Sequence, residues 1–224
     1  MMNRLYQLIF PNAAPAPQPP PQPLPGQQLR RRGPQNNIYK LVIWGKYGVG
    51  KSSIVTLLEK GDFTLYNPYV IRPDFPYADM SLEDGSLIRL QLWDTAGQER
   101  YFQKLRPIHF READLFLVVY DPTDSDSFKW AQDTLETLST SPDVDKATCQ
   151  ILLICHHKAK LPNEASQPKE TMWAVSKSQG QQLAVEYDTF FMEMNAAHEG
   201  ALLLLHHKLR EMLHKAKLSQ QLNN

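Results

Sequence analysis

Cysteine is scarce in this sequence, and long apolar runs are missing. Only Cys149 and Cys155 occur among the 224 residues, which is too few for a disulfide framework and favours a reducing compartment. No apolar run approaches the length of a transmembrane helix. Residues 1–10 contain an apolar stretch too short for a secretory signal, without a small-residue cleavage site. We therefore expect a cytoplasmic protein, either resident in the cytosol or delivered into a host cell.

Acidic residues are absent from the first 37 positions, where four arginines occur. The whole chain has 24 basic and 24 acidic residues, so positions 38–224 carry 24 minus 4, or 20, basic residues against 24 acidic ones. A mildly acidic body argues against generic binding to the phosphate backbone of nucleic acids. We expect no nucleic-acid partner.

Proline sets the N-terminal segment apart, because nine of the 17 prolines fall between positions 11 and 36. This composition predicts an extended or disordered segment rather than packed structure. Two overlapping P-x-x-P stretches could dock on an aromatic groove, but no flanking arginine would orient them, so a spacer is favoured. Arg30–Arg32 could touch an acidic surface. We divide the chain into a proline-rich extension at 1–37, a folded domain at 38–217 and a short polar tail at 218–224.

The stretch from Gly45 to Ser52 carries most of the chemical information. It reads GKYGVGKS and fits the pattern G-x-x-x-x-G-K-[ST]. Its glycines let successive backbone N–H groups turn towards phosphate oxygens, and a helix that begins near Gly50 adds the positive end of its dipole. Lys51 can reach the outer phosphates of a nucleotide, and the Ser52 hydroxyl can ligate Mg²⁺. An apolar run before the loop and a helix-like stretch after it, ended by Gly61, supply the expected context.

From Ile38 onward, strand-like and helix-like stretches alternate, which is typical of an α/β sheet with crossover helices. Expected strands lie at 41–44, 77–82, 87–93, 115–120, 150–155 and 190–194, and expected helices lie at 53–60, 128–138, 176–187 and from about 201. The second and third strands flank the turn sequence Glu-Asp-Gly-Ser and should form a hairpin. We predict a P-loop α/β domain with a mostly parallel six-stranded sheet flanked by helices.

A second phosphate motif, WDTAGQE, follows the hairpin at residues 93–99. Asp94 stands at the carboxyl end of a strand beside the phosphate loop, where a metal shell needs a carboxylate. Gly97 lets a backbone N–H approach a γ-phosphate, and Gln98 can orient an attacking water.

With both motifs in place, residues 38–217 resemble the Ras-like G domain of the Ras-superfamily small GTPases. YDPT at 120–123 is similar to Rab proteins and LRP at 105–107 is similar to Rho proteins, so the chain looks like a divergent Rab/Rho-like member. The resemblance implies a molecular switch that binds GTP or GDP with Mg²⁺. It also implies effector or regulator proteins that bind the two switch regions, at 60–77 and 94–110.

The resemblance assigns roles residue by residue. Gln98 would be the catalytic residue that positions water, and Ser52 and Asp94 would hold Mg²⁺. Phe63 falls where the family keeps an aromatic ring against the base, with a plain core aromatic as an equal alternative. The residues expected to bind the nucleotide are Gly45, Tyr47, Gly48, Val49, Gly50, Lys51, Ser52, Ser53, Phe63, Asp94, Gly97, His156, His157, Asn195 and Ala196.

Three motifs depart from the family pattern. The threonine of Y-x-P-T is replaced by Tyr69, or by Val70 or Ile71 if the register is counted back from Asp94, so a Mg²⁺ ligand and γ-phosphate sensor is missing either way. The guanine-reading N-K-x-D becomes HHKA at 156–159, and the lost aspartate would accept two hydrogen bonds worth about 1.5–3 kcal/mol each. S-A-K becomes NAA at 195–197, where the backbone of Ala196 could still serve.

Two further departures concern turnover and membrane attachment. Tyr47 occupies a loop position where relatives mostly carry a small residue. Its ring would crowd Gln98 and any inserted arginine finger, which is worth about 10³ to 10⁵ in rate, so we predict slow hydrolysis. The sequence ends SQQLNN without a cysteine, so we expect no direct lipid anchor and any membrane attachment to come through a partner or the N-terminal segment.

Three functions fit these observations. The first is a GTP-binding switch with slow hydrolysis, which rests on the two intact phosphate motifs. The second is a pseudo-GTPase, an interaction module with degenerate guanine recognition. The third is a P-loop protein that uses ATP and GTP alike.

Overall fold

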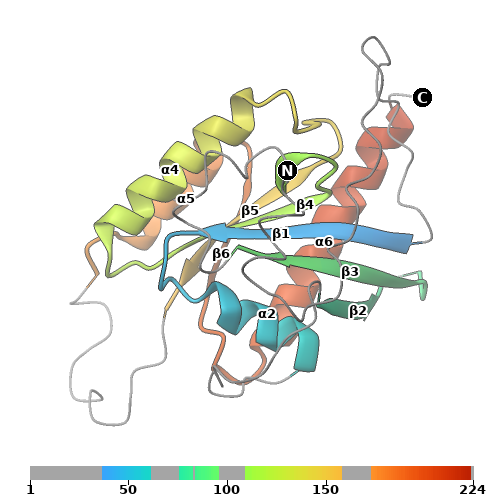
Figure 1. The fold of residues 1–224 in the computed structure, drawn as a ribbon, viewed down its shortest axis with the longest axis horizontal. Helices are drawn as coiled ribbons and strands as arrows, with labels where there is room; N and C mark the ends of the chain where they lie inside the picture. Colours follow the sequence, from blue (N-terminus) through green and yellow to red (C-terminus); the bar gives the residue numbers. More distant parts are fainter. Residues whose placement is uncertain (1–36, 62–75, 83, 96–108, 158–172, 223–224) are drawn as a thin grey trace, which may run out of the picture. The chain divides into compact units, whose positions relative to one another are not determined.

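A computed structural model describes residues 37–61, 76–82, 84–95, 109–157 and 173–222 of the chain. These residues form, in order, β1 (Ile38–Gly45), α2 (Lys51–Lys60), β2 (Tyr77–Ser81), β3 (Leu87–Asp94), β4 (Leu115–Tyr120), α4 (Ser125–Thr140), β5 (Gln150–His156), α5 (Lys177–Glu186), β6 (Phe190–Met194) and α6 (Ala201–Leu222) (Figure 1). None of the helices in the described ranges is long and apolar enough to cross a membrane.

The strands form one six-stranded sheet in the order β2-β3-β1-β4-β5-β6. Strand β2 pairs with β3 in antiparallel fashion, and every other neighbouring pair is parallel. All six residues of β4 are buried, as expected for a central strand covered on both faces. The predicted fold, a mostly parallel six-stranded sheet with flanking helices, is confirmed.

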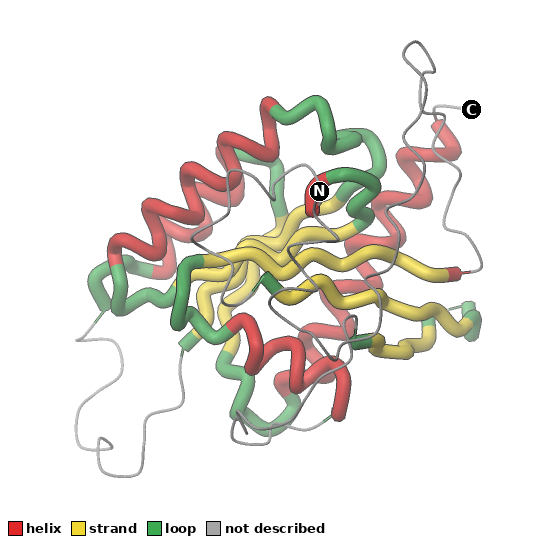
Figure 2. Tube along the Cα trace, in the orientation of Figure 1, coloured by secondary structure: helices red, strands yellow, loops and turns green. Residues whose placement is uncertain are grey.

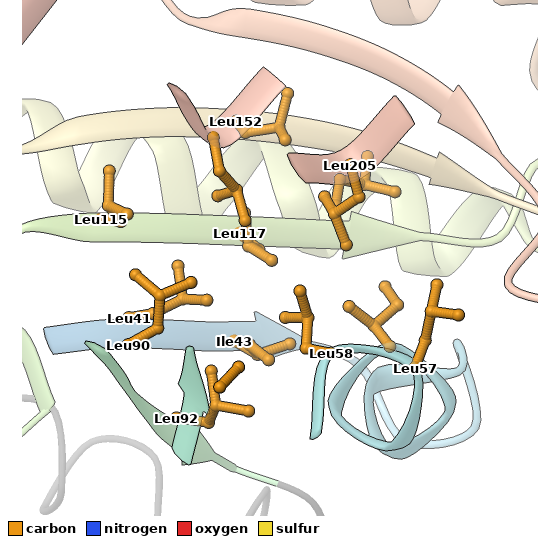
Figure 3. Close-up of a cluster of buried hydrophobic side chains, with 14 of the residues drawn as sticks. Leu41, Ile43, Leu57, Leu58, Leu90, Leu92, Leu115, Leu117, Leu152 and Leu205 are labelled. Atoms are coloured by element: carbon orange, nitrogen blue, oxygen red, sulfur yellow. The ribbon is translucent and has the colours of Figure 1, made fainter. Parts of the chain in front are cut away.

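Two hydrophobic cores cover the two faces of the sheet. Because side chains alternate along a strand, Leu41 and Ile43 of β1 enter one core while Val42 and Trp44 enter the other. Helices α2 and α6 pack over the first core, and α4 and α5 pack over the second. Figure 2 shows the helices on either side of the yellow strands, and Figure 3 shows leucines of the first core between strands and helices.

The boundaries of most elements differ from the predicted ones by up to three residues. Helix α2 begins at Lys51 rather than Ser53, because its N-cap Gly50 turns the chain with φ of 100° directly before it. Gly61, with φ of 74°, ends this helix as predicted. Strand β5 continues to His156, and α6 runs on through part of the segment expected as a polar tail.

Candidate functional site

The phosphate loop joins β1 to α2 in the middle of the sheet. Strand β1 lies between β3 and β4, so β2 and β3 lie on one side of it and β4, β5 and β6 lie on the other. The carboxyl ends of β1, β3, β4, β5 and β6 share one edge, because these strands are parallel. Ligands of open α/β sheets bind at this edge, beside the point where strand order reverses.

Lys51 is held inside the phosphate loop. Its side chain is buried, and Nζ donates to the carbonyl oxygens of Gly45 at 2.7 Å and Lys46 at 3.0 Å. These two contacts set the ammonium group at the first turn of α2, where the helix dipole also favours an anion. The arrangement suits a cation that meets phosphate oxygens.

Ser52 and Asp94, the two predicted Mg²⁺ ligands, lie together. The Ser52 hydroxyl donates to Oδ2 of Asp94 at 3.1 Å. The next residue, Thr95, donates from its hydroxyl to the carbonyl of Ile43 at 2.8 Å and ties the end of β3 to β1. A hydroxyl and a carboxylate are hard oxygen ligands, and both are partly accessible, so this pair fits Mg²⁺.

Lys46 connects the phosphate loop to α4, a contact that the motif alone does not reveal. Its Nζ lies 3.0 Å from Oδ2 of Asp124, which also caps α4 by accepting from the backbone N–H groups of Asp126 and Ser127. Burial raises the pKa of Asp124, but the hydrogen bonds from Lys46 and Ser127 outweigh it and leave the pKa below its ordinary value. The aspartate before α4 is a recognisable N-cap, but its loop partner stands 78 residues away.

Tyr47 stands at the rim of the same loop. Its side chain is 79% exposed, unlike that of the next apolar loop residue, Val49, which is buried. A large exposed ring at this position can contact whatever approaches the outer end of a bound nucleotide.

His156 is the last residue of β5 and contacts the phosphate loop. Its Nδ1 is 2.8 Å from the carbonyl oxygen of Val49, and its Nε2 accepts from the backbone N–H of Ala196 at 3.4 Å. A Cβ atom on Gly50 would collide with this ring. His156 therefore bridges two loops.

The side chain of His157 contacts Glu193 and Trp173. Its Nε2 lies 2.9 Å from Oε1 of Glu193, and its ring centre lies 4.6 Å from that of Trp173. Lys177 pairs with the other carboxylate oxygen of Glu193 at 3.0 Å. Burial would raise the pKa of Glu193, but the Lys177 and His157 contacts lower it overall.

The structure thus brings most of the described candidates to one edge of the sheet. The loop residues Gly45, Tyr47, Gly48, Val49, Gly50, Lys51, Ser52 and Ser53 meet Asp94, His156 and Ala196 there. Asn195 adjoins Ala196 and accepts from the backbone N–H of Ala197 at 2.9 Å. Phe63, Tyr69, Gly97 and Gln98 lie outside the described residues. Within the described ranges, no group of three or more His, Cys, Asp and Glu side chains could hold a metal ion.

Comparison with known proteins identifies the domain. The model of the Ras family matches residues 40–214. The chain belongs to the Ras family. Ras-family GTPases generally bind GTP or GDP with Mg²⁺ and interact with effectors and regulators. The phosphate loop and the Ser52–Asp94 pair thus lie within a small GTPase-like nucleotide-binding domain.

Several Ras-family relatives are longer proteins. The chain is 34% identical over 164 residues to a Ras and EF-hand domain-containing protein homolog of Caenorhabditis briggsae, and equally so to that of Caenorhabditis elegans. In both cases the match covers 73% of this chain and 24% of the relative. It is 34% identical over 186 residues to the Ras and EF-hand domain-containing protein of Danio rerio, covering 82% of this chain and 26% of that protein. The chain thus spans about a quarter of the length of these relatives.

Proposed function

We propose that this chain is a GTP-binding molecular switch of divergent Rab/Rho-like type, with slow GTP hydrolysis. The observation that carries the proposal is the convergence of Lys51, Ser52 and Asp94 at the carboxyl edge of the sheet. A buried ammonium, a hydroxyl and a carboxylate around one helix N-terminus are the groups that a Mg²⁺-nucleotide complex requires.

Each of these residues has a distinct task. Lys51 would contact the outer phosphates, and the backbone N–H groups of the loop would donate to the phosphate oxygens. Ser52 and Asp94 would hold Mg²⁺ through their hydroxyl and carboxylate oxygens. Bound Mg²⁺ would neutralise the charge that develops on the phosphates during hydrolysis.

Slow turnover follows from Tyr47. Its side chain is exposed at the loop, and we propose that the ring crowds an inserted arginine finger and the water that Gln98 would orient. Gln98 is the proposed catalytic residue. The switch regions at 60–77 and 94–110 are proposed to contact effectors or regulators.

A second candidate function, a phosphate-loop protein that does not choose between GTP and ATP, draws support from the end of β5. The ring nitrogens of His156 contact backbone groups of Val49 and Ala196, and Nε2 of His157 contacts Glu193. Ala159 cannot supply the carboxylate that would read guanine. Selection of guanine would then need groups other than these three residues.

The decisive experiment is to denature freshly purified protein and identify any nucleotide that co-purified. GTP, GDP and ATP are then titrated with and without Mg²⁺, with Lys51→Ala as the matched variant that lacks the phosphate-binding ammonium. Tight, Mg²⁺-dependent GTP and GDP binding that Lys51→Ala loses supports the switch. Equal ATP and GTP affinity supports the second candidate, and no affinity for any of them would reject both in favour of an interaction module.

The remaining parts of the chain are assigned on composition. We propose a G domain at 38–217, a short polar tail at 218–224 and an N-terminal extension at 1–37 that acts as a spacer or as the ligand of a proline-binding or acidic partner. The protein would work in the cytoplasm and reach membranes through a partner. Fractionation of cells that express the full chain, compared with a variant lacking residues 1–37, tests both assignments.

A further inference from the structure

One buried histidine connects the two loops on which nucleotide binding would depend. His156 is 3% exposed and ends β5, whereas its contacts Val49 and Ala196 belong to the phosphate loop and to the loop between β6 and α6. We call the three residues Val49, His156 and Ala196 the histidine bridge.

The two contacts of the bridge determine where the ring proton resides. The carbonyl of Val49 can only accept a hydrogen bond, so Nδ1 of His156 must carry a hydrogen to donate. The backbone N–H of Ala196 can only donate, so Nε2 must present its lone pair. Both conditions hold together only for the neutral imidazole with its proton on Nδ1.

The ring also shapes the loop by direct contact. The ring occupies the position that a Cβ atom on Gly50 would take. Gly50 is the N-cap of α2 and directly precedes Lys51. A shift of the ring would therefore disturb Gly50 and the first turn of α2, where Lys51 lies. His156 is in this sense a positioning residue for the phosphate loop.

Charged groups on the surrounding elements have their own partners. These groups are Lys46 and Lys51 on the loop and α2, Asp121 after β4, His157 on β5, Glu193 on β6 and His198 before α6. Lys51 contacts loop carbonyls, and Asp121 accepts from the backbone and hydroxyl of Thr123. Lys46 pairs with Asp124, Glu193 pairs with His157 and Lys177, and His198 contacts the backbone of Glu199.

We propose that His156 holds the phosphate loop against the β6–α6 loop only while it is neutral, so that acidification releases the bridge and weakens nucleotide binding. A second proton would turn Nε2 into a donor that faces the N–H donor of Ala196. Ala196 is itself buried, so its N–H would be left without an acceptor. The same proton would add a positive charge to a buried ring.

The effect on affinity rests on the proposed nucleotide-binding function. Affinity for Mg²⁺-GDP is measured in steps from about pH 8 through about pH 5.5 to the most acidic pH at which the protein stays folded, because burial of the ring opposes uptake of the proton. We expect wild type to lose roughly tenfold or more in affinity at the acidic end of this range, because a buried donor loses its partner. His156→Asn should bind with little pH dependence, since an amide can donate to Val49 and accept from Ala196 without titrating.

His198→Asn is the matched control, because His198 lies in the same loop as Ala196 but is exposed and contacts only its neighbouring backbone among the contacts above. It should keep the pH dependence of wild type. Equal pH dependence in wild type and His156→Asn, or none in wild type, would overturn the proposal.

A measurement on wild type without nucleotide separates the bridge from the proposed function. Nitrogen NMR at neutral pH should find His156 protonated on Nδ1 alone, and hydrogen exchange should show the Ala196 amide protected at about pH 8 and less protected at the acidic end of the same range, relative to the intrinsic exchange rate. A proton on Nε2 at neutral pH contradicts the bridge. Should nucleotide binding be absent while both signals are found, the bridge stands and the proposed function fails. The test also holds if His156→Asn does not fold.

Discussion

The hydroxyl of Ser52 donates a hydrogen bond to Oδ2 of Asp94 across 3.1 Å and joins the first turn of α2 to the last residue of β3. The two residues are 42 positions apart. They meet because β1 pairs with β3 in a register that sets Asp94 opposite Ile43, two residues before the loop that leads into α2.

Removal of the Ser52 hydroxyl should weaken Mg²⁺-dependent binding specifically. We expect Ser52→Ala to lower the affinity for Mg²⁺-GDP by roughly tenfold or more, because a metal ligand next to a charged group is lost. Titration calorimetry of the same variant with Mg²⁺ and with EDTA checks this, since the variant and wild type should bind alike without the metal. An equal loss in both conditions would indicate damage to the loop instead.

Alanine at Gly50 should cost more stability than alanine at Gly48. Both glycines have positive φ, of 100° and 81°, so each substitution carries about 1–2 kcal/mol of backbone strain. A Cβ at Gly48 would meet nothing within 4 Å, whereas one at Gly50 would collide with the ring of His156. Urea unfolding of both variants measures the difference. Similar free energies of unfolding would contradict the packing of His156 against the loop.

Replacement of Tyr47 by glycine should raise the intrinsic rate of GTP hydrolysis. The side chain is 79% exposed at the loop rim, so its removal opens space without taking support from the core. Single-turnover hydrolysis of preloaded GTP measures the rate, with Tyr47→Gly/Gln98→Ala as the matched double variant. The double variant should show no gain, and an unchanged rate in Tyr47→Gly would reject crowding as the cause of slow turnover.

Replacement of Gly180 in α5 by alanine should lower the free energy of unfolding, although alanine usually stabilises a helix relative to glycine. Such a change ordinarily stabilises by about 0.5–1 kcal/mol, but a Cβ here would collide with the hydroxyl of Tyr120 and crowd Phe191. We expect Gly180→Ala to lower the free energy of unfolding, and Gly180→Ala/Tyr120→Phe to recover part of the loss. Chemical denaturation of the single and double variants provides the test. No recovery would place the strain at Phe191 alone.

Acid should destabilise the fold in part through His206. Burial, followed by the nearby charge of Arg210, lowers the pKa of His206 in the folded protein. The unfolded chain therefore binds the proton more readily, and stability present above the ordinary pKa of about 6.5 is lost as the pH falls below it. His206→Gln should show a shallower loss of unfolding free energy on acidification than wild type. His207→Gln, at an exposed position of the same helix, is the control and should follow wild type.

Local patterns were enough to predict the sheet and the phosphate loop. The GKYGVGKS stretch encodes its own turn, because glycines at fixed spacing and a following helix act within a few residues of one another. Apolar runs and alternating apolar residues likewise predicted the six strands, because the spacing of apolar residues reflects whether one or both faces of a strand are buried. The meeting of Ser52 and Asp94 follows from the same logic, because parallel strands share a carboxyl edge.

The α/β order, the phosphate loop and the sheet edge at which a ligand would bind could all be predicted from local residue patterns. The separate contacts of His156 with the phosphate loop and of His157 with Glu193 could not be predicted in this way, because their partners come from other elements of the fold. Only the tertiary structure decided the Lys46–Asp124 pair and the contact between His156 and Val49, whose partners lie 78 and 107 residues apart. Contacts over such distances depend on how separate elements pack, and no local pattern of residues encodes that packing.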